Sequence, residues 1–302
     1  MSYISVSEFA KRHGVSERTV RNYCATGKIV EAFITGKTWS VPGDAELPKK
    51  KAVKVQEMPL LKVLREQKEM NLRGGIYHYT QVELTYNSNH IEGSRLTQDQ
   101  TRYIFETNTI GITQEGVRVD DIIETVNHFR CVDYIIDTAG ECLTEKYIKH
   151  LHSLLKMGTS DSNKEWFRVG EYKLLPNEVG GEDTCAPEDV SDEMKRLLDD
   201  YNKGGVKKLE EVIDFHYRFE RIHPFQDGNG RVGRLIMFKE CLCNGIIPYI
   251  ITSDLKMFYY KGLQEWSRVR GFLLDTCLTT QDFYIQKMDF FQNKTLILRQ
   301  NR

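Results

Sequence analysis

One stretch of fourteen residues constrains this chain more than any other. It runs from Arg221 to Arg234 and reads RIHPFQDGNGRVGR. It contains one imidazole, one carboxylate, several arginines, and an asparagine that lies between two glycines. These groups can hold a polyphosphate and move a proton beside it. The stretch therefore predicts phosphate chemistry before the rest of the chain is considered.

The local structure expected around this stretch is helix, turn, helix. Residues 210–221 have helical apolar spacing, and Pro224 breaks that helix. The glycines then allow a tight turn, and a new helix is expected over 231–243. Its N-terminus offers unpaired N–H groups and the positive end of the helix dipole, which together favour anions. Arg231 and Arg234 lie three residues apart, so both can reach successive phosphates.

The segment 228–233 also satisfies G-x-G-x-x-G, which is typical of dinucleotide-binding folds. That fingerprint requires a buried strand directly before it. Residues 214–221 are instead charged and of helical period. A dinucleotide fold is therefore not expected.

Two side chains in the stretch are candidates for chemistry, and a third for anchoring. His223 has a usual pKa that lets it accept a proton near pH 7. Asp227 can help to hold Mg²⁺ on bound phosphates. Phe225 is expected to anchor the loop in the core. A histidine before a loop is often only structural, but the clustering of polar groups favours catalysis.

The body of the chain is predicted to be mainly α-helical. Apolar residues recur at helical spacing, with capping and stop signals between the segments. The exception is 166–187, whose extended 167–176 part and following turn residues predict a hairpin. The helices are expected over 60–74, 79–93, 98–106, 120–135, 144–155 and 188–201.

The first 42 residues have the pattern of two short helices and a hairpin. Helices are expected over 5–13 and from Ser16, followed by a hairpin over 32–42. This arrangement resembles the winged helix-turn-helix of the MerR and excisionase group, which implies DNA binding. The alternative is a protein-interaction unit. By the resemblance, five residues are candidates to face DNA: Arg18, Thr19, Arg21, Asn22 and, at the wing tip, Lys37.

Charge supports a division of the chain. Residues 1–55 hold ten Lys or Arg against five Asp or Glu, whereas the whole chain has a net charge of −1. A basic unit thus precedes an acidic body. Residues 43–59 lack periodicity, contain Pro48 and a lysine run, and are expected to be a linker. The run is a solvated tether or an additional phosphate contact.

Seven scattered cysteines without a C-x-x-C pair favour reduced thiols over a disulfide frame or a zinc site. The first residues lack a signal-peptide pattern, and no apolar run is long enough to span a bilayer. We therefore expect a cytoplasmic protein without a membrane partner. A homo-oligomer is left open.

The stretch from His223 to Arg234 resembles the signature H-P-F-x-[D/E]-G-N-G-R-x-x-R of the Fic family without departure. Fic proteins are α-helical enzymes that mostly transfer AMP from ATP to a hydroxyl of a target protein. The resemblance implies that His223 deprotonates a Ser, Thr or Tyr hydroxyl and that Asp227 positions Mg²⁺. It further implies an anion hole at Gly228 to Gly230, α- and β-phosphate contacts from Asn229 and Arg231, and a γ-phosphate contact from Arg234.

A second segment, Ser88 to Gly93, reads SNHIEG and resembles the inhibitory motif [S/T]-x-x-x-E-[G/N] of the same family. Ser88 and Glu92 would share one face of a helix over about 79–93. The resemblance implies a salt bridge from Glu92 to Arg234 that removes the arginine needed by the γ-phosphate. The alternative is a surface glutamate before a glycine that ends the helix.

Further expectations rest on the resemblance. Residues 60–302 would form the Fic domain, with 166–187 as the flap that docks a target segment by main-chain pairing. Tyr259 and Tyr260 would border the adenine. The expected function is an autoinhibited protein adenylyltransferase, able to modify itself. Alternatives are removal of AMP from a modified target, transfer of another phosphate-containing group, or a DNA-binding regulator whose Fic domain senses nucleotide.

Overall fold

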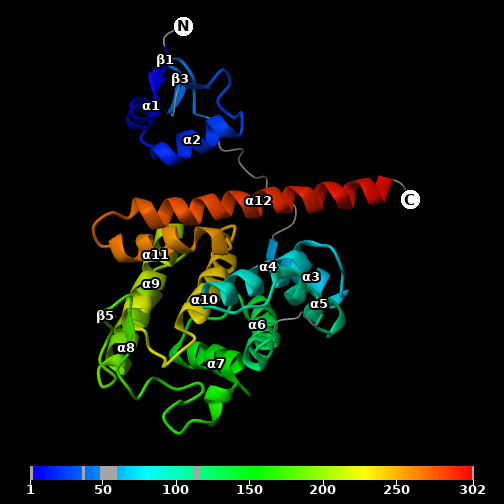
Figure 1. Ribbon diagram of the computed structural model, residues 1–302, viewed down its shortest axis with the longest axis vertical. Coiled ribbons are helices and arrows are strands. Elements are labelled where there is room, and N and C mark those ends of the chain that lie inside the picture. Colours follow the sequence, from blue (N-terminus) through cyan, green and yellow to red (C-terminus); the bar gives the residue numbers. More distant parts are fainter. Residues whose placement is uncertain (1–2, 36–37, 48–59, 112–115, 301–302) are drawn as a thin grey trace.

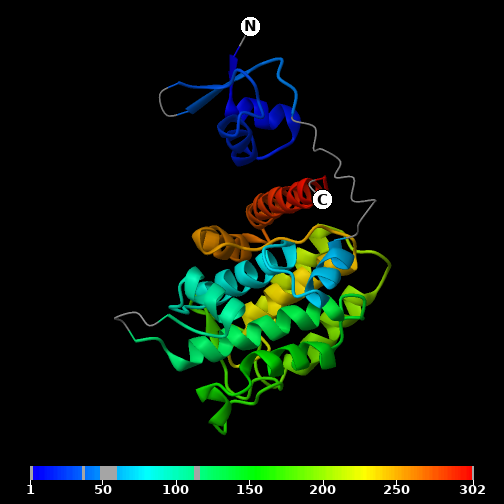
Figure 2. The same cartoon turned by 90° about the vertical axis from the view of Figure 1, so that its right-hand side faces the viewer.

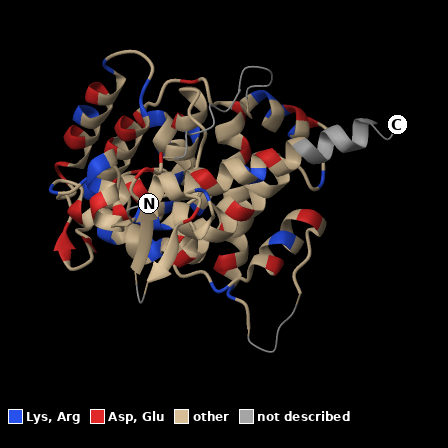
Figure 3. Ribbon diagram, turned by 90° about the horizontal axis from the view of Figure 1, so that it is seen from above, with Lys and Arg blue, Asp and Glu red and all other residues tan. Residues whose placement is uncertain are grey.

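The chain is mainly helical, as its apolar periodicity predicted (Figure 1). The structure is a computed structural model that describes residues 3–35, 38–47, 60–111 and 116–300. None of the helices in these ranges is both long enough and apolar enough to cross a membrane. Acidic and basic residues are interspersed along the helices seen from above (Figure 3).

The N-terminal unit contains the two predicted helices and the predicted hairpin. Ser5 and Ser16 cap the helices by accepting hydrogen bonds from backbone N–H groups. A first strand that the sequence did not predict pairs with the last one, which gives the sheet order β1-β3-β2. Phe9, Val20 and Val41 are fully buried between helices and sheet. The elements are β1 Tyr3–Ser5, α1 Val6–His13, α2 Glu17–Ala25, β2 Phe33–Thr35 and β3 Thr38–Pro42.

The body is a bundle of helices, above which α12 lies on the side of the N-terminal unit (Figures 1 and 2). The α-helices are α3 Leu60–Glu69, α4 Ile76–Ile91, α5 Gln98–Thr107, α6 Val119–Asp137, α7 Glu145–Lys156, α8 Val190–Asn202, α9 Leu209–Ile222, α10 Asn229–Cys243, α11 Lys256–Glu265 and α12 Gly271–Gln300. Two 3₁₀ turns, Ser160–Asn163 and Ser253–Leu255, complete the body. The expected 79–93 helix thus begins earlier, at Ile76, directly after Gly75.

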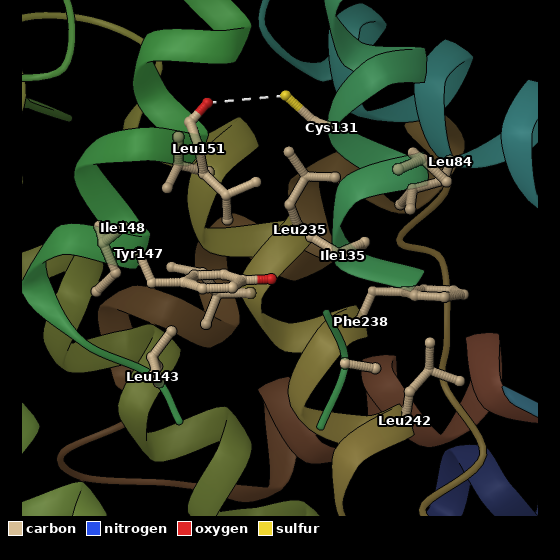
Figure 4. Close-up of a cluster of buried hydrophobic side chains, with 14 of the residues drawn as sticks. Leu84, Cys131, Ile135, Leu143, Tyr147, Ile148, Leu151, Leu235, Phe238 and Leu242 are labelled. Carbon is tan, nitrogen blue, oxygen red and sulfur yellow. Dashed lines mark hydrogen bonds between the residues drawn. The ribbon is translucent and has the colours of Figure 1, made fainter. Parts of the chain in front are cut away.

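Helix α10 lies at the centre of the bundle and packs against α4, α6, α7 and α9. Its first residues follow the glycine-rich turn, and nearly all of its side chains are buried. Leu235 and Phe238 meet Ile135 of α6 and Tyr147 of α7 in one apolar cluster (Figure 4). Because apolar burial of this kind stabilises by about 25 cal/mol per Å², the helix that begins in the 221–234 stretch is firmly held.

The hairpin predicted in 166–187 is present, but the prediction of extended strand over 167–176 was wrong. The strands are β4 Glu178–Val179 and β5 Glu182–Asp183, joined by two glycines with positive φ. Segment 167–176 instead packs on the body. Lys173 is buried there, and its backbone N–H donates to the carbonyl of Pro224 at 2.9 Å. The segment pairs with the phosphate motif, so its backbone is not available for a long hairpin.

Candidate active site

The loop between α9 and α10 is held by a ring stack and by one amide. Phe225 is fully buried and lies parallel to the ring of His152, with centroids 4.0 Å apart. The side chain of Asn229 accepts from the N–H of Phe225 at 2.8 Å and donates to its carbonyl at 2.7 Å. Phe225 is therefore the predicted anchor, and the Asn229 amide closes the turn. A phosphate contact from Asn229 stays a prediction.

The N-terminus of α10 is open toward the site. Gly228 takes the cap position with φ of 84°, and no side chain caps the helix. The left-handed backbone explains the glycine there. At Gly230, an added Cβ would overlap the carboxylate of Glu92. The absence of a side chain therefore lets Glu92 lie against the first turn of α10.

Arg234 and Glu92 form the predicted ion pair, with 2.7 Å between Nη2 and Oε1. Ser88 accepts from Nε of the arginine at 3.0 Å through its hydroxyl and from Nη2 at 2.9 Å through its carbonyl. Burial alone would lower the pKa of Arg234, but the charge of Glu92 more than offsets it and the pKa is raised. Gly93 follows with φ of 94° after α4 has ended. The segment 88–93 thus meets the stretch 221–234 directly.

His223 ends α9 in the left-handed region, with φ of 51°. Its side chain is 17% exposed, and Nδ1 is buried without a hydrogen-bond partner among the described residues. Burial, reinforced by the charge of Lys173, lowers the pKa of His223 to about 4. The imidazole is therefore neutral at pH 7, and Nε2 is the nitrogen left to accept a proton.

Asp227 and Arg231 belong to a closed network of alternating charges. Lys156 of α7 lies 2.6 Å from Asp227 Oδ2 and 2.5 Å from Glu124 of α6. Arg231 completes the ring by pairing with Glu124 and, at 3.1 Å, with Asp227. Burial would raise the pKa of Asp227, but Arg231 and Lys156 lower it below its usual value. The carboxylate is therefore ionised and held in place.

The sequence analysis missed Glu124 and Lys156. Lys156 is almost completely buried although it carries a charge. Both residues lie on helices interpreted as core, far in sequence from the motif, and no local pattern marks them. The single hint is a lysine directly after the apolar pair Leu154-Leu155 of α7.

A cavity of about 600 Å³ collects six of the predicted residues. Its wall includes Glu92, His223, Gly230, Arg234, Tyr259 and Tyr260, together with both strands of the β4–β5 hairpin. Asp227 and Arg231 adjoin it through the charge network, and Gly228 caps α10 beside it. A neutral base, an open helix N-terminus and a buried arginine thus surround one space large enough for a small ligand.

Comparison with known proteins agrees with this geometry. Residues 142–241 match the model of the Fic/DOC family. This segment contains the complete motif and the helices α7 to α10 that position it. Residues 142–241 form a Fic/DOC domain.

Curated relatives of this Fic domain include the "Protein adenylyltransferase Fic" of Drosophila willistoni. It is 32% identical over 184 residues, which cover 59% of this chain and 35% of the relative. The protein of the same name from Culex quinquefasciatus is 29% identical over 215 residues, which cover 68% of this chain and 41% of the relative. The chain thus spans about a third to two fifths of these relatives' length.

Solved structures show the same fold. A Fic domain containing signaling protein from Bacteroides thetaiotaomicron has a TM-score of 0.60 and 27% identity, and covers 76% of this chain and 94% of its own. Residues 134–508 of Fic-1 from C. elegans give a TM-score of 0.61 at 18% identity. The match covers 80% of this chain and 74% of that structure. The second likeness concerns the fold alone.

The two tyrosines predicted beside the nucleotide occupy different positions at the Fic site. Tyr259 is buried, and its hydroxyl lies 2.6 Å from Nε2 of His216. The guanidinium of Arg234 lies over its ring at 5.9 Å. Tyr260 is partly exposed and lies beside Lys256. Tyr259 therefore supports the arginine, whereas Tyr260 offers a ring to the cavity.

A magnesium ion is implied by the resemblance, and the donor set can be tested against it. The described residues contain no group of three or more His, Cys, Asp or Glu that could hold a metal. Mg²⁺ nevertheless often binds through one or two carboxylates plus substrate phosphates. Asp227 has an ionised carboxylate that is 48% exposed. The residues therefore fit an ion that arrives with a nucleotide.

The residues predicted to face DNA are mostly engaged within the protein. The guanidinium of Arg18 lies 4.4 Å from the ring of Phe258 on α11. Thr19 donates its backbone N–H to Ser16 at 3.1 Å, and Arg21 pairs with Glu17 at 2.6 Å. Asn22 is exposed on α2. Lys37 lies outside the described residues, so the wing tip stays a prediction.

Proposed function

We propose that this chain is an autoinhibited protein adenylyltransferase. It would transfer AMP from ATP to a Ser, Thr or Tyr hydroxyl of a target protein or of itself and release pyrophosphate. The observation that carries the proposal is the neutral imidazole of His223 beside the open N-terminus of α10 in one cavity with Arg234. The names of the curated relatives support the same chemistry.

In the proposed reaction, Nε2 of His223 takes the proton of the attacking hydroxyl. The hydroxyl oxygen bonds to the α-phosphorus as the bond from that phosphorus to pyrophosphate breaks. The backbone N–H groups at Gly228 to Gly230 and the guanidinium of Arg231 would stabilise the phosphate charge. Arg234 would hold the γ-phosphate and so set the in-line geometry.

Inhibition would follow because the guanidinium of Arg234 is already bound by a carboxylate of the same chain. Glu92 takes the Nη2 donor, and its carboxylate lies against Gly230 at the helix N-terminus. A γ-phosphate would have to displace this carboxylate, since both are anions that need the same guanidinium. ATP could then bind only in an unproductive position.

Asp227, with Glu124 nearby, would hold Mg²⁺ on the phosphates. When bound, the ion would neutralise phosphate charge that builds up on the leaving group. The β4–β5 hairpin at the cavity wall would dock the target segment by main-chain pairing within 166–187. Its register with the target is left to experiment.

The test is incorporation of labelled AMP from ATP with Mg²⁺. Self-labelling should be weak in the natural chain, rise at least about tenfold in Glu92→Gly and vanish in Glu92→Gly/His223→Ala. Glu188→Gln, an exposed glutamate, is the matched control and should label like the natural chain. Equal labelling of all variants would exclude the mechanism.

We also propose that the N-terminal unit binds DNA. The supporting observation is the pair of short helices followed by a hairpin, with Asn22 exposed on the second helix. Binding to the DNA upstream of its own coding sequence should weaken as salt rises. It should be lost in Arg18→Ala/Arg21→Ala and unaffected by His223→Ala. Salt-insensitive binding, or none, would favour a protein partner instead.

A further inference from the structure

Glu220 is a buried carboxyl group that the proposed reaction leaves without a task. It lies on α9, three residues before His223, and its side chain is only 12% exposed. Oε1 is buried and has no hydrogen-bond partner among the described residues. A buried acceptor without a partner destabilises the fold, so such a group calls for an explanation.

The carboxyl is not explained by an ion pair with Arg234. The carboxylate bound to that arginine belongs to Glu92, at 2.7 Å. Glu220 instead approaches two imidazoles, with Oε1 3.9 Å from Nε2 of His216 and Oε2 3.9 Å from Nδ1 of His223. Nε2 of His216 is already engaged by the hydroxyl of Tyr259 at 2.6 Å. Nδ1 of His223 is the nitrogen that remains.

The unpartnered Nδ1 of His223 therefore faces Oε2 of Glu220 across 3.9 Å, while the unpartnered Oε1 of the same carboxyl lies toward His216. Catalytic hydrogen bonds are often long before substrate binds and tighten in the complex. A closer approach by about 1 Å would make this contact a hydrogen bond. Glycine at position 233 leaves room for the carboxyl, because an added Cβ would lie 2.8 Å from its Oε1.

We propose that Glu220 is a positioning residue that acts through His223, an inference that rests on the proposed function. The Glu220 carboxylate holds the imidazole through Nδ1–H and balances its charge when Nε2 accepts the hydroxyl proton. The proton itself stays on His223 and leaves to solvent after transfer of AMP. No proton passes to Glu220, and no further reactant is needed.

The charges around Glu220 connect this role to inhibition. Burial raises the pKa of Glu220 to about 8, although the positive charge of Arg234 lowers it. The negative charge of Glu92 adds to the rise. The other titratable groups that interact with it are His216, His223, Tyr259 and Tyr260. Withdrawal of Glu92 removes a negative charge and lowers this pKa. The carboxylate form would then be present at neutral pH, where it can support His223.

NMR of the full chain tests the contact without relying on activity. The ring ¹⁵N shifts of His223 should change near pH 8 as Glu220 ionises. This step should move to lower pH in Glu92→Gly and be absent in Glu220→Gln. Glu210→Gln, an exposed glutamate on the same helix, should keep it. A natural chain whose His223 shifts do not respond near pH 8 would overturn the proposal.

Activity provides the second arm, in the Glu92→Gly background. The rate should rise with pH until Glu220 is ionised. Glu220→Gln should lower the plateau at least about tenfold and remove that rise, and Glu220→Asp should restore part of both. A Glu220→Gln rate within about twofold of its parent at every pH contradicts the inference. Absence of labelling in Glu92→Gly itself would instead count against the proposed function.

Discussion

The carboxylate of Glu92 lies 2.7 Å from Nη2 of Arg234, although 142 residues separate them in the sequence. The contact joins the end of α4 to the central helix α10. Only one side of it is rigid, because Arg234 lies on a buried helix while Glu92 follows the last turn of its own. Release of the proposed inhibition is therefore expected to move Glu92 rather than Arg234.

Ser88→Ala should activate the enzyme less than Glu92→Gly does. The change removes the hydroxyl that accepts from Nε of Arg234 at 3.0 Å but keeps the Glu92 ion pair. An arginine donor left unpaired costs about 1–3 kcal/mol, which weakens the hold of α4 on α10. Self-labelling with ATP should increase several-fold. Ser191→Ala, at an exposed position of α8, is the matched control.

Lys156→Met should destabilise the fold by about 3 kcal/mol, because removal of one partner leaves buried charge uncompensated. Lys156 pairs with both Glu124 and Asp227, and its side chain is only 2% exposed. The double variant Lys156→Met/Glu124→Gln should cost less than the sum of the single changes. Urea unfolding measures all three. Additive losses would mean that the network is not coupled.

Gly233→Ala should lower the free energy of unfolding by about 1–3 kcal/mol through overpacking. Its Cβ would lie 2.7 Å from the ring of His216 and 2.8 Å from the Glu220 carboxyl, both on α9. Gly140→Ala is the control, since nothing lies within 4 Å of an added Cβ there. Equal denaturation midpoints for the two variants would contradict the close packing of α9 on α10.

The chain should lose stability as the pH falls below 6.5. Burial lowers the pKa of His128, His152 and His216 to about 3, so the unfolded chain binds more protons than the folded one. Stability contributed by a neutral buried histidine is present above the unfolded pKa and falls by about 1.4 kcal/mol per pH unit below it. Urea unfolding at pH 7.5 and pH 5 measures this loss. The free energy of unfolding should differ less between the two pH values in His152→Phe than in the natural chain.

Local signals were enough for much of the fold. Helices begin close to where the sequence predicted them, and Ser5, Ser16, Thr97 and Thr144 cap them, because capping depends on residues only three positions apart. The loop and the open helix N-terminus follow from Pro224 and the glycines. The prediction that Glu92 reaches Arg234 required the family resemblance, since no local rule joins α4 to α10.

Long-range packing accounts for the errors. Segment 167–176 looks extended and strand-like, but Lys173 donates its N–H to Pro224 in a distant loop. Strand β1 is only three residues long and is fixed by its pairing with β3. Glu124 and Lys156 acquire a function only when α6 and α7 are brought beside the motif. Such contacts depend on tertiary structure, which spacing along one helix does not encode.

The burial of α10 has a consequence for how this protein can diversify. A helix enclosed on nearly every side tolerates few substitutions, so the frame proposed to receive the phosphates can change little in sequence. The residue that restrains it comes from a neighbouring helix end, where changes disturb little packing. Sequence drift at the end of α4 could therefore reset the threshold for activity in small steps, while the chemistry itself stays the same.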